Sequence, residues 1–423
     1  MSEWIEKPLS ELVTFQKGRK VDTSAFANEG FAAYLGASGI EGGHDGFAAT
    51  QHGVIAKRTD TLMLWDGERS GLVGFDKEGV VASTVSKLTP NEQIDPQYLF
   101  FVLSDRFGWI QHRRTGTGVP HVPKDLGRIL KLRYPKALSV QSKIAAILTT
   151  NDIAIEKTKA LVAKYKQIKT GLMHDLFTRG VLPNGQLRPS RSQAPGMYRE
   201  TEIGWVPKEW KVSILEELLA PLPNNIRSGP FGSALLKHEL VEDGIPFLGI
   251  DNVHVERFEP EFRRFVSEQK FKELAKYRVR PRDVVITIMG TVGRCCVIPD
   301  NLELGLSSKH LWTMTFDLEK AIPELICWQL NHSAWAKAWF RRAMQGGIMD
   351  AIQSSTLKTL HLPIPDLNEQ TLIYARYIKV SAQIQQESLL LEKLRKQKIG
   401  LMQDLLTGKV PVHVKEPNTE VTA

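Results

Sequence analysis

An internal repeat is the strongest constraint on how this chain can fold. The segment Gly171-Leu-Met-His-Asp-Leu-Phe-Thr178 recurs as Gly400-Leu-Met-Gln-Asp-Leu-Leu-Thr407, 229 positions later. A period above two hundred residues excludes solenoid and propeller repeats, and further matches at offsets that fall steadily toward the N-terminus indicate a duplicated domain with short insertions in its second copy. The sequence therefore predicts two homologous halves. The further matches pair Ile144 with Ile373 at an offset of 229, Asp60 with Asp283 at 223, and Trp4 with Trp210 at 206.

Each half opens with short strand-like runs separated by turns rich in Gly, Asp and Pro. The runs Thr61-Leu-Met-Leu-Trp65 and Val284-Val-Ile-Thr-Ile288 are typical of buried strands. An apolar pattern of helical period follows in both halves. We therefore predict two α+β globular domains, at residues 1–138 and 205–366.

A different pattern closes each half, at residues 139–180 and 367–408. Apolar side chains there recur in alternating steps of four and three over nearly forty residues. This 3.5-residue period keeps one stripe of a helix facing a partner, and such a helix would be about 60 Å long, too long for one domain face. We predict two long helices that form a coiled coil. The seam residues are Ile144, Leu148, Ile155, Val162 and Leu172 in the first helix, and Ile373, Tyr377, Ile384, Leu391 and Leu401 in the second.

Residues 181–204 form the predicted connection between the halves. The stretch from Gly180 to Gly196 contains three prolines, three glycines and two serines, which favour an extended linker. Such a linker lets the second half turn back. We therefore expect antiparallel helices with one globular domain at each end, related by an approximate two-fold axis, and a polar C-terminal tail at 409–423.

The net charge suggests an acidic partner, although its location weakens the suggestion. Of 423 residues, 42% are hydrophobic and 24% are charged, which indicates a folded globular protein. The formal charge is +8, as in many proteins that bind nucleic acid. However, residues 141–182 and 370–410 each contain seven Lys/Arg and three Asp/Glu, so the excess lies on the predicted helices.

The chain has the features of a cytoplasmic protein. Cys295 and Cys296 are adjacent and Cys327 is alone, so these cysteines make neither a disulfide framework nor a zinc site. The N-terminus carries acids where a signal peptide carries cations, and no apolar run approaches a membrane span of about twenty residues. We expect no association with a membrane.

The known motifs of catalysis are missing. There is no GxxxxGK[ST] loop, no HExxH, no GxSxG and no Pro-Pro dipeptide, which excludes the [DN]PP[YF] signature of an amino-methyltransferase. The histidines have no metal-ligand spacing, and Asp66 with Glu68 is better interpreted as a solvated turn than as an acid/base pair. We predict no catalytic residue, no metal site and no cofactor in this chain.

The duplicated architecture resembles the DNA-specificity subunit of type I restriction-modification systems. In that family a proline-rich segment ending in Glu-Gln opens each long helix, as Leu360-His-Leu-Pro-Ile-Pro-Asp-Leu-Asn-Glu-Gln370 does here, after a Gly-rich stretch such as Thr115-Gly-Thr-Gly118 or Gly346-Gly347. The segment Ile203-Gly-Trp-Val-Pro-Lys-Glu-Trp-Lys-Val212 resembles the opening of a second recognition domain. The first copy departs from the pattern, since Val140 precedes Gln141 where the second copy has glutamate.

The resemblance implies a function in a multi-subunit complex. Each globular domain would be a target recognition domain that reads one half of a bipartite site in double-stranded DNA, and the helices would set the spacer. Two methylation subunits, which bind S-adenosylmethionine, and restriction/motor subunits would be its partners. Two other interpretations stay open: a stand-alone DNA-modifying enzyme with an unrecognised site, and a coiled-coil adaptor without a DNA role.

Two basic loci occur at corresponding places in the halves and are candidates for DNA contact. One is the loop after the opening helix, where glycine lets backbone approach phosphate and Arg or Asn can reach base edges. The other is a pair of arginines at a helix end, where stabilisation of the helix dipole is an equal explanation. The candidates are Lys17, Arg19, Lys20, Arg113, Arg114 and Lys124 in the first half, and Asn224, Asn225, Arg227, Arg341 and Arg342 in the second.

Overall fold

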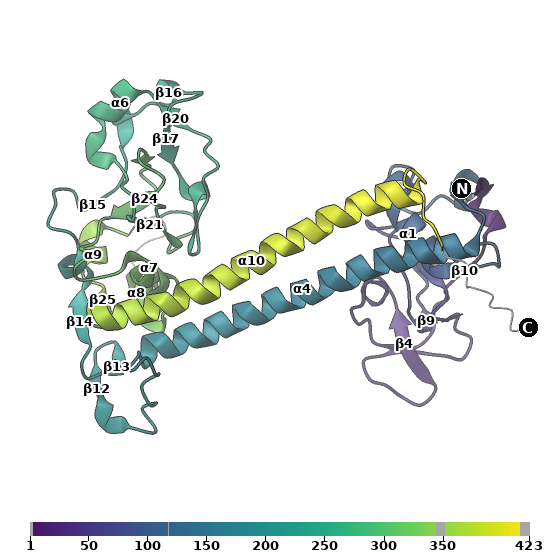
Figure 1. Cartoon of the computed structure of the whole chain (residues 1–423), viewed down its shortest axis with the longest axis horizontal. Helices are drawn as coiled ribbons and strands as arrows, with labels where there is room; N and C mark the ends of the chain where they lie inside the picture. Colours follow the sequence, from purple (N-terminus) through teal and green to yellow (C-terminus); the bar gives the residue numbers. More distant parts are fainter. Residues whose placement is uncertain (1–2, 117, 344–351, 415–423) are drawn as a thin grey trace, which may run out of the picture. The chain divides into compact units, whose positions relative to one another are not determined.

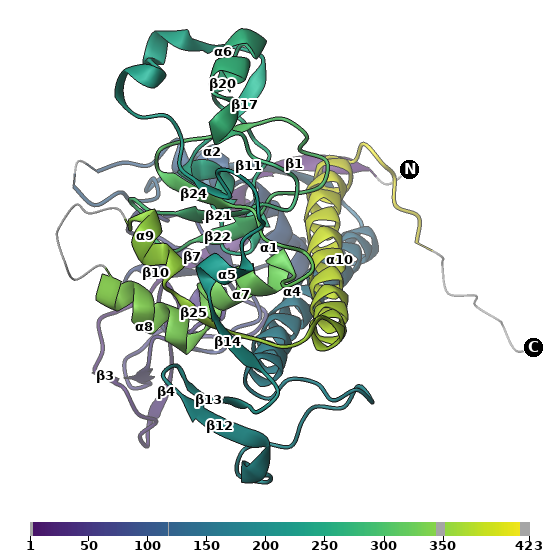
Figure 2. The same cartoon turned by 90° about the vertical axis from the view of Figure 1, so that its left-hand side faces the viewer.

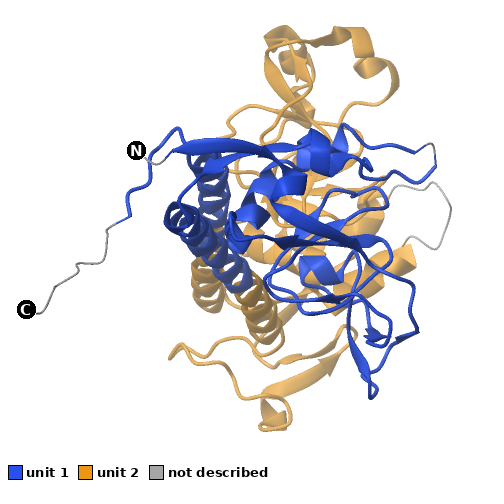
Figure 3. Cartoon of the chain, turned by 90° about the vertical axis from the view of Figure 1, so that its right-hand side faces the viewer, with its two compact units in different colours: residues 1–162, 387–423 blue, residues 163–386 orange. Residues whose placement is uncertain are grey.

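The computed structural model describes residues 3–116, 118–343 and 352–414. The chain divides into two compact units, blue and orange in Figure 3: a first unit of residues 1–162 and 387–423, and a second unit of residues 163–386. Two long helices, α4 (Leu138–Thr178) and α10 (Leu367–Leu406), each contribute to both units. Among the described residues, no helix is both long enough and apolar enough to span a membrane.

The first unit is built from three small sheets and three short helices. Its sheets are β1 (Trp4–Pro8) with β11 (Lys131–Pro135); β2 (Val13–Lys17), β10 (Val85–Pro90), β7 (Thr61–Leu64) and β8 (Val73–Gly74) in that order; and β3 (Thr23–Ser24), β5 (Phe47–Ala49), β4 (Phe31–Leu35), β9 (Gly79–Val81) and β6 (Ile55–Ala56) in that order. Its helices are α1 (Pro96–Asp105), α2 (Phe107–Gln111) and α3 (Leu126–Ile129).

The second unit repeats this plan with additions. Its two-stranded sheets are β12 (Tyr198–Thr201) with β13 (Gly204–Pro207), β14 (Lys211–Ile214) with β25 (His361–Ile364), and β18 (Val253–His254) with β19 (Arg257–Phe258). One four-stranded sheet has the order β15 (Ile226–Arg227), β24 (Leu311–Met314), β21 (Val284–Thr287) and β22 (Cys295–Val297). The other has the order β16 (Leu240–Val241), β20 (Phe265–Val266), β17 (Ile245–Leu248) and β23 (Leu306–Ser307). Its helices are α5 (Leu215–Leu218), α6 (Glu268–Glu273), α7 (Pro323–His332), α8 (Ala334–Ala343) and α9 (Ser354–Lys358).

The strand connections show the duplication directly. The sheet order β2-β10-β7-β8 of the first unit corresponds to β15-β24-β21-β22 of the second, and the pair β1–β11 corresponds to β14–β25. Both units also contain one parallel pair, β4 with β9 and β17 with β23. The helix α7 packs against β21 and β22 (Figure 2). The predicted fold class, two α+β domains with two long packed helices, is confirmed.

The two long helices run antiparallel, because each unit holds the beginning of one and the end of the other (Figure 1). In the first unit Ile144 and Leu148 share a core with Leu405, and in the second Leu176 shares a core with Ile373. All ten predicted seam side chains are buried or half-buried, whereas many other positions of the two helices are exposed. The 3.5-residue period in the sequence therefore corresponds to a real contact stripe.

A buried glutamine ties the start of each long helix to its globular domain. The Gln141 side chain accepts a hydrogen bond from Asp95 N (2.8 Å) and donates to the carbonyl oxygens of Gln93 and Pro135. Gln370, its counterpart 229 positions later, makes the same set of bonds. It accepts from Ile322 N (2.9 Å) and donates to the carbonyl oxygens of Lys320 and Pro365. Because both side chains are buried and fully bonded, their amides set the angle at which each helix leaves its domain.

The residue before each glutamine explains the departure seen in the first copy. Glu369 is buried and accepts hydrogen bonds from Val181 N (2.6 Å) and Trp210 Nε1 (2.9 Å), and it forms an ion pair with buried Arg188 (3.2 Å). These partners belong to the chain that leaves α4. Val140 occupies the equivalent position in the first unit and packs in its apolar core. The glutamate therefore anchors the segment that leaves α4, whereas the apolar side chain of Val140 cannot make such bonds.

Candidate nucleic-acid interface

A glycine in each unit brings a basic loop against the sheet. A Cβ atom on Gly18 would clash with the carbonyl oxygens of Val81 and Ala82, and a Cβ on Gly229 would clash with the backbone of Ser307 and Ser308. Both glycines follow the equivalent strands β2 and β15, so the two loops occupy corresponding places. The first predicted basic locus is therefore one structural feature that is present twice. The opening helix does not lead directly into it, because a strand lies between them in each unit.

In the first unit the loop carries two exposed cations. Arg19 and Lys20 are exposed, and neither has a hydrogen bond or ion pair within the described part of the chain. Lys17 differs, because it ends strand β2 and its Nζ lies 2.9 Å from Asp66. Asp66 also bonds the ring of His121 at 2.6 Å, so this carboxylate has a structural role rather than an acid/base one.

A hollow of about 540 Å³ lies next to this loop in the first unit. Phe15 and Trp65 form part of its wall, with their rings edge to face at 6.1 Å. Lys17 and Lys124, two of the predicted DNA contacts, both line it and therefore lie on one surface. Cations beside aromatic faces are typical of nucleic-acid surfaces, because phosphates and bases can be bound together.

The second unit carries a large side chain at the place that corresponds to this hollow. The strand correspondence of β10 with β24 places Trp312 where the first unit has Ser86, which lines the hollow. The indole of Trp312 donates to the Ile352 carbonyl oxygen at 2.6 Å and packs against the core. The two domains thus share a fold but present different surfaces.

Two of the three predicted contacts in the loop of the second unit, Asn225 and Arg227, are bound within the fold itself. Asn224 is exposed in a left-handed turn (φ 57°), and Asn225 donates to the Ala220 carbonyl oxygen at 2.9 Å. Arg227 is only 4% exposed and forms an ion pair with Asp283, which is also buried. Burial lowers the pKa of Arg227 to about 10, although the nearby Asp283 carboxylate acts in the opposite direction. This burial argues against a direct contact between Arg227 and DNA.

Other cations form the basic surface of the second unit. A groove of about 380 Å³ lies beside the loop after Gly229, and Lys237, Arg264, Lys309 and His310 all line it. Lys309 is exposed and has no ion pair among the described residues, whereas Arg264 is paired with Asp251. Our sequence reasoning missed these residues. The signal was available in the internal alignment, because matching β10 with β24 places Lys309 and His310 where the first half has only Ser83 and Thr84.

The pKa of His310 reflects the positive charge around this groove. Its pKa is lowered, first by burial and then by the positive charges of Lys309 and Arg264. The imidazole is therefore neutral at neutral pH, with one nitrogen as donor and the other as acceptor. A neutral imidazole beside two cations can hydrogen bond a base edge while the cations contact phosphate.

The arginine pairs have mixed surroundings. Arg113 lies over the Trp109 ring at 3.9 Å, and Arg114 donates to the carbonyl oxygens of Gln111 and Glu68. Arg341 and Arg342 are exposed in the last turn of α8. Thr117 of the first Gly-rich stretch and Gly346-Gly347 of the second lie outside the described residues. Over the described ranges, no group of three or more His, Cys, Asp or Glu residues could hold a metal ion.

Comparison with known proteins agrees with this fold. Residues 1–165 match the family described as Type I restriction modification DNA specificity domain. The type I restriction enzyme MjaVIII specificity subunit of Methanocaldococcus jannaschii is 27% identical over 424 residues, covering 97% of this chain and 93% of that one.

Two solved structures share the fold over nearly the whole chain. The type I restriction-modification system S subunit from M. genitalium superposes with a TM-score of 0.63 at 15% identity, over 98% of this chain and 97% of that chain. A chain from a structure on complex assembly and conformational transition of the type I R-M system gives a TM-score of 0.51 at 14% identity, over 96% and 98%.

The duplicated α+β domain, with a long helix after each copy and the helices paired antiparallel, is a fold that the chain shares with the type I restriction-modification S subunit from M. genitalium. Residues 1–165 match the DNA specificity domain of type I systems, and nearly the whole chain is similar to a type I specificity subunit.

Proposed function

We propose that this subunit reads a bipartite DNA target, one half with each globular domain. The duplicated glycine loop, with exposed cations beside it in both units, is the observation that carries the proposal. Residues 1–138 and 205–366 are the two target recognition domains, and the different surfaces around Ser86 and Trp312 make the target asymmetric. Residues 139–180 and 367–408 form the spacer helices, with the linker at 181–204 and the tail at 409–423.

The partners follow from the same proposal. The chain assembles with double-stranded DNA, two methylation subunits that bind S-adenosylmethionine, and restriction/motor subunits. The likeness to a chain from a type I R-M complex supports assembly of this kind. The methylation subunits dock on the spacer helices, whose exposed faces carry Ile153, Leu389 and Leu390. Exposed apolar side chains on a charged helix are typical of a surface that a partner covers.

A domain exchange tests this function. Replacing residues 205–366 by the corresponding domain of the MjaVIII relative is expected to change one half of the methylated sequence completely and leave the other half and the spacer unchanged. Each domain has its own core and its own basic surface, so each reads DNA independently. Methylation sequencing of DNA modified by the assembled complex gives the result. A change in both halves, or in neither, would contradict the proposal.

Removing the exposed loop cations should weaken binding without altering sequence preference. Lys309→Gln and Arg19→Gln are each expected to lower affinity similarly on target and non-target DNA, and to reduce the slope of log affinity against log salt concentration by about 0.9. Titration of labelled duplexes with the assembled complex at several salt concentrations measures both. Lys131→Gln changes an exposed lysine on β11 that lines neither the hollow of the first unit nor the groove of the second, and it should leave the slope unchanged. An unchanged slope in the loop variants would exclude these contacts.

A further inference from the structure

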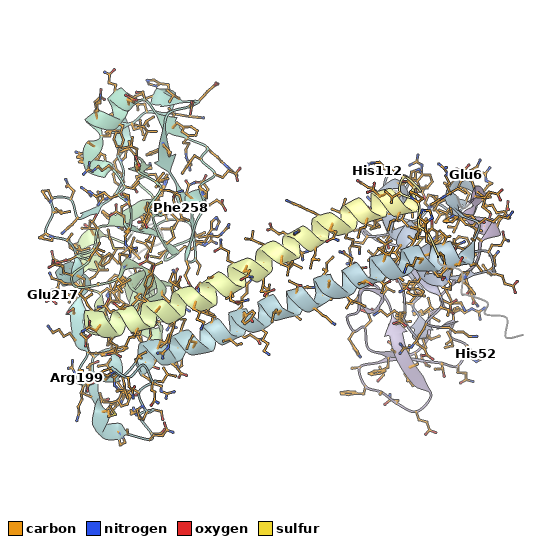
Figure 4. The ribbon with its side chains drawn as sticks, viewed as in Figure 1. Glu6, His52, His112, Arg199, Glu217 and Phe258 are labelled. Carbon is orange, nitrogen blue, oxygen red and sulfur yellow. The ribbon has the colours of Figure 1, made fainter. Side chains whose placement is uncertain are left out.

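One carboxylate in the second unit receives hydrogen bonds from three helices. The side chain of Glu256 accepts from Lys169 Nζ of α4 (2.6 Å), from Tyr377 Oη of α10 (2.7 Å) and from the His332 ring of α7 (2.6 Å). Glu256 lies in the turn between β18 and β19, the hairpin that ends at Phe258, which is labelled in Figure 4. The recognition domain and both spacer helices are therefore joined at a single side chain.

The backbone of Glu256 is strained, and its side chain is largely shielded from solvent. Glu256 has φ 58°, a left-handed conformation that is uncommon for a residue other than glycine. Its backbone nitrogen donates to the Cys295 carbonyl oxygen at 2.9 Å, which holds the turn against β22. The side chains of Glu256 and Lys169 are 14% and 19% exposed. An uncommon backbone conformation is kept only where surrounding contacts hold it, and here a partly buried ionic network does so. The contact of Glu256 with the helices is therefore a defined feature of the fold.

The network keeps Glu256 charged. Burial by itself would raise the pKa of Glu256, but the hydrogen bonds from His332, Lys169 and Tyr377 and the charge of Lys169 lower it to about 2. The Lys169 ammonium also lies 4.5 Å from the centre of the Tyr377 ring. The carboxylate is thus ionised, and its charge-assisted hydrogen bonds are directional. Because the three donors come from three helices, they constrain the hairpin in more than one direction.

Apolar contacts also join this domain to the helices, beside the Gln370 bonds at the start of α10 and the bond from Tyr374 of α10 to Glu324 of α7 (3.3 Å). Phe177 of α4 stacks on Trp328 of α7 with ring centres 4.2 Å apart, and Leu325 of α7 lies in the same core as Ile373 of α10. Apolar contacts have little directionality, so they hold the surfaces together without fixing their rotation. Glu256 differs from the other polar contacts in that it bonds α4 and α10 at once, and so fixes the hairpin against both helices.

The first unit has no such contact among its described residues. Between β4 and β5, where the second unit carries the β18–β19 hairpin, it has only a short helix at Gly39–Glu41. Lys398, the counterpart of Lys169 at the offset of 229, pairs instead with Asp152 of α4 at 2.6 Å. Lys398 lies 5.8 Å from the centre of the Phe101 ring of α1, so it contacts the first recognition domain only through an aromatic face. The lysine is present in both copies, but only in the second does it pair with a carboxylate of the recognition domain.

We propose that Glu256 is a positioning residue that sets the rotation of the second recognition domain on the spacer helices, and with it the spacer length accepted between the two half-sites. This inference rests on the proposed function. A base pair more or less in the spacer moves one half-site around the duplex as well as along it. A domain with a fixed rotation rejects such a target, and a domain that can turn accepts it.

The test is methylation by the assembled complex on duplexes that carry both half-sites at the native spacing, or with one base pair added or removed. The target is first read by methylation sequencing. Glu256→Gln keeps the shape of the side chain and removes its charge. We expect it to reduce the preference for the native spacing by about tenfold or more while both half-sites stay the same, because charged hydrogen bonds are lost.

Glu259→Gln is the matched control, because Glu259 lies just past the same hairpin and pairs with exposed Arg257. It should keep the wild-type preference. Tyr377→Phe removes one bond without altering charge, and is expected to shift the preference in the same direction by a smaller factor; it carries the test if Glu256→Gln does not fold. An unchanged spacing preference in a folded variant overturns the inference. Wild-type complex that methylates without regard to either half-site refutes the proposed function instead.

Discussion

Glu369→Val is expected to destabilise the second unit by about 3–5 kcal/mol, although valine occupies the equivalent position, Val140, in the first unit. Arg188 is 4% exposed on its side chain and loses its buried partner, while the Val181 amide and the Trp210 indole lose their acceptor. The buried Arg188 charge without its partner lowers the free energy of unfolding by more than the ion pair had raised it. Urea unfolding followed by tryptophan fluorescence measures the change, since Trp210 reports on the site itself.

The double variant Glu369→Val with Arg188→Met separates the lost charge from the lost packing. Removing both charges leaves an apolar site of similar volume, and we expect it to recover much of the stability lost in the single variant. Glu217→Val, at an exposed position on α5, is a control for introducing valine at a surface-accessible glutamate. A single variant as stable as the wild type would mean that Glu369 does not anchor the linker.

Arg227→Met should produce a loss of similar size, about 3–5 kcal/mol near neutral pH, and the loss should depend on pH. Burial raises the pKa of Asp283, while the charge of Arg227 lowers it. Without Arg227 that pKa rises further. A carboxyl whose pKa is higher in the folded than in the unfolded state stabilises the fold when protonated, and this contribution is lost as pH rises through the folded-state pKa. The variant should therefore be closest to the wild type under acid conditions.

Two comparisons make the Arg227 result decisive. Asp283→Asn in the Arg227→Met background removes the ionisable group, so the dependence on pH should largely disappear and part of the stability should return. DNA affinity measured on the folded fraction should change little, because the guanidinium is occupied by Asp283, Thr315 and backbone carbonyl oxygens. A large loss of affinity in a fully folded variant would restore Arg227 as a DNA contact.

The architecture could be predicted because it rests on patterns that are repeated along the chain. The match of residues 171–178 with 400–407 and the 3.5-residue period of both helices predicted the duplication and the helix pairing, and the structure agrees. The glycine loops were also found from the sequence, at Gly18 and Gly229. Each of these signals is local or repeats at a fixed offset, so it survives without knowledge of the tertiary contacts.

Which charged side chains form buried ion pairs could not be predicted in the same way. Arg227 and Asp283 are 56 positions apart and become an ion pair only when β15, β24 and β21 form one sheet. Glu256, Lys169 and Tyr377 come from three distant segments. The loop arginines Arg19 and Arg227 were predicted on the same pattern, yet Arg19 is exposed and Arg227 is buried in an ion pair.

The sequence alone thus determined the duplicated α+β plan, the antiparallel helices and the class of protein, because amphipathic periods and repeated segments are encoded residue by residue. The tertiary structure decided which cations are exposed, which bonds hold each helix to its domain, and which buried partners Glu369 has. These depend on burial and on the approach of charges from distant segments, and the energy of a charge is set by its surroundings rather than by its neighbours in the chain.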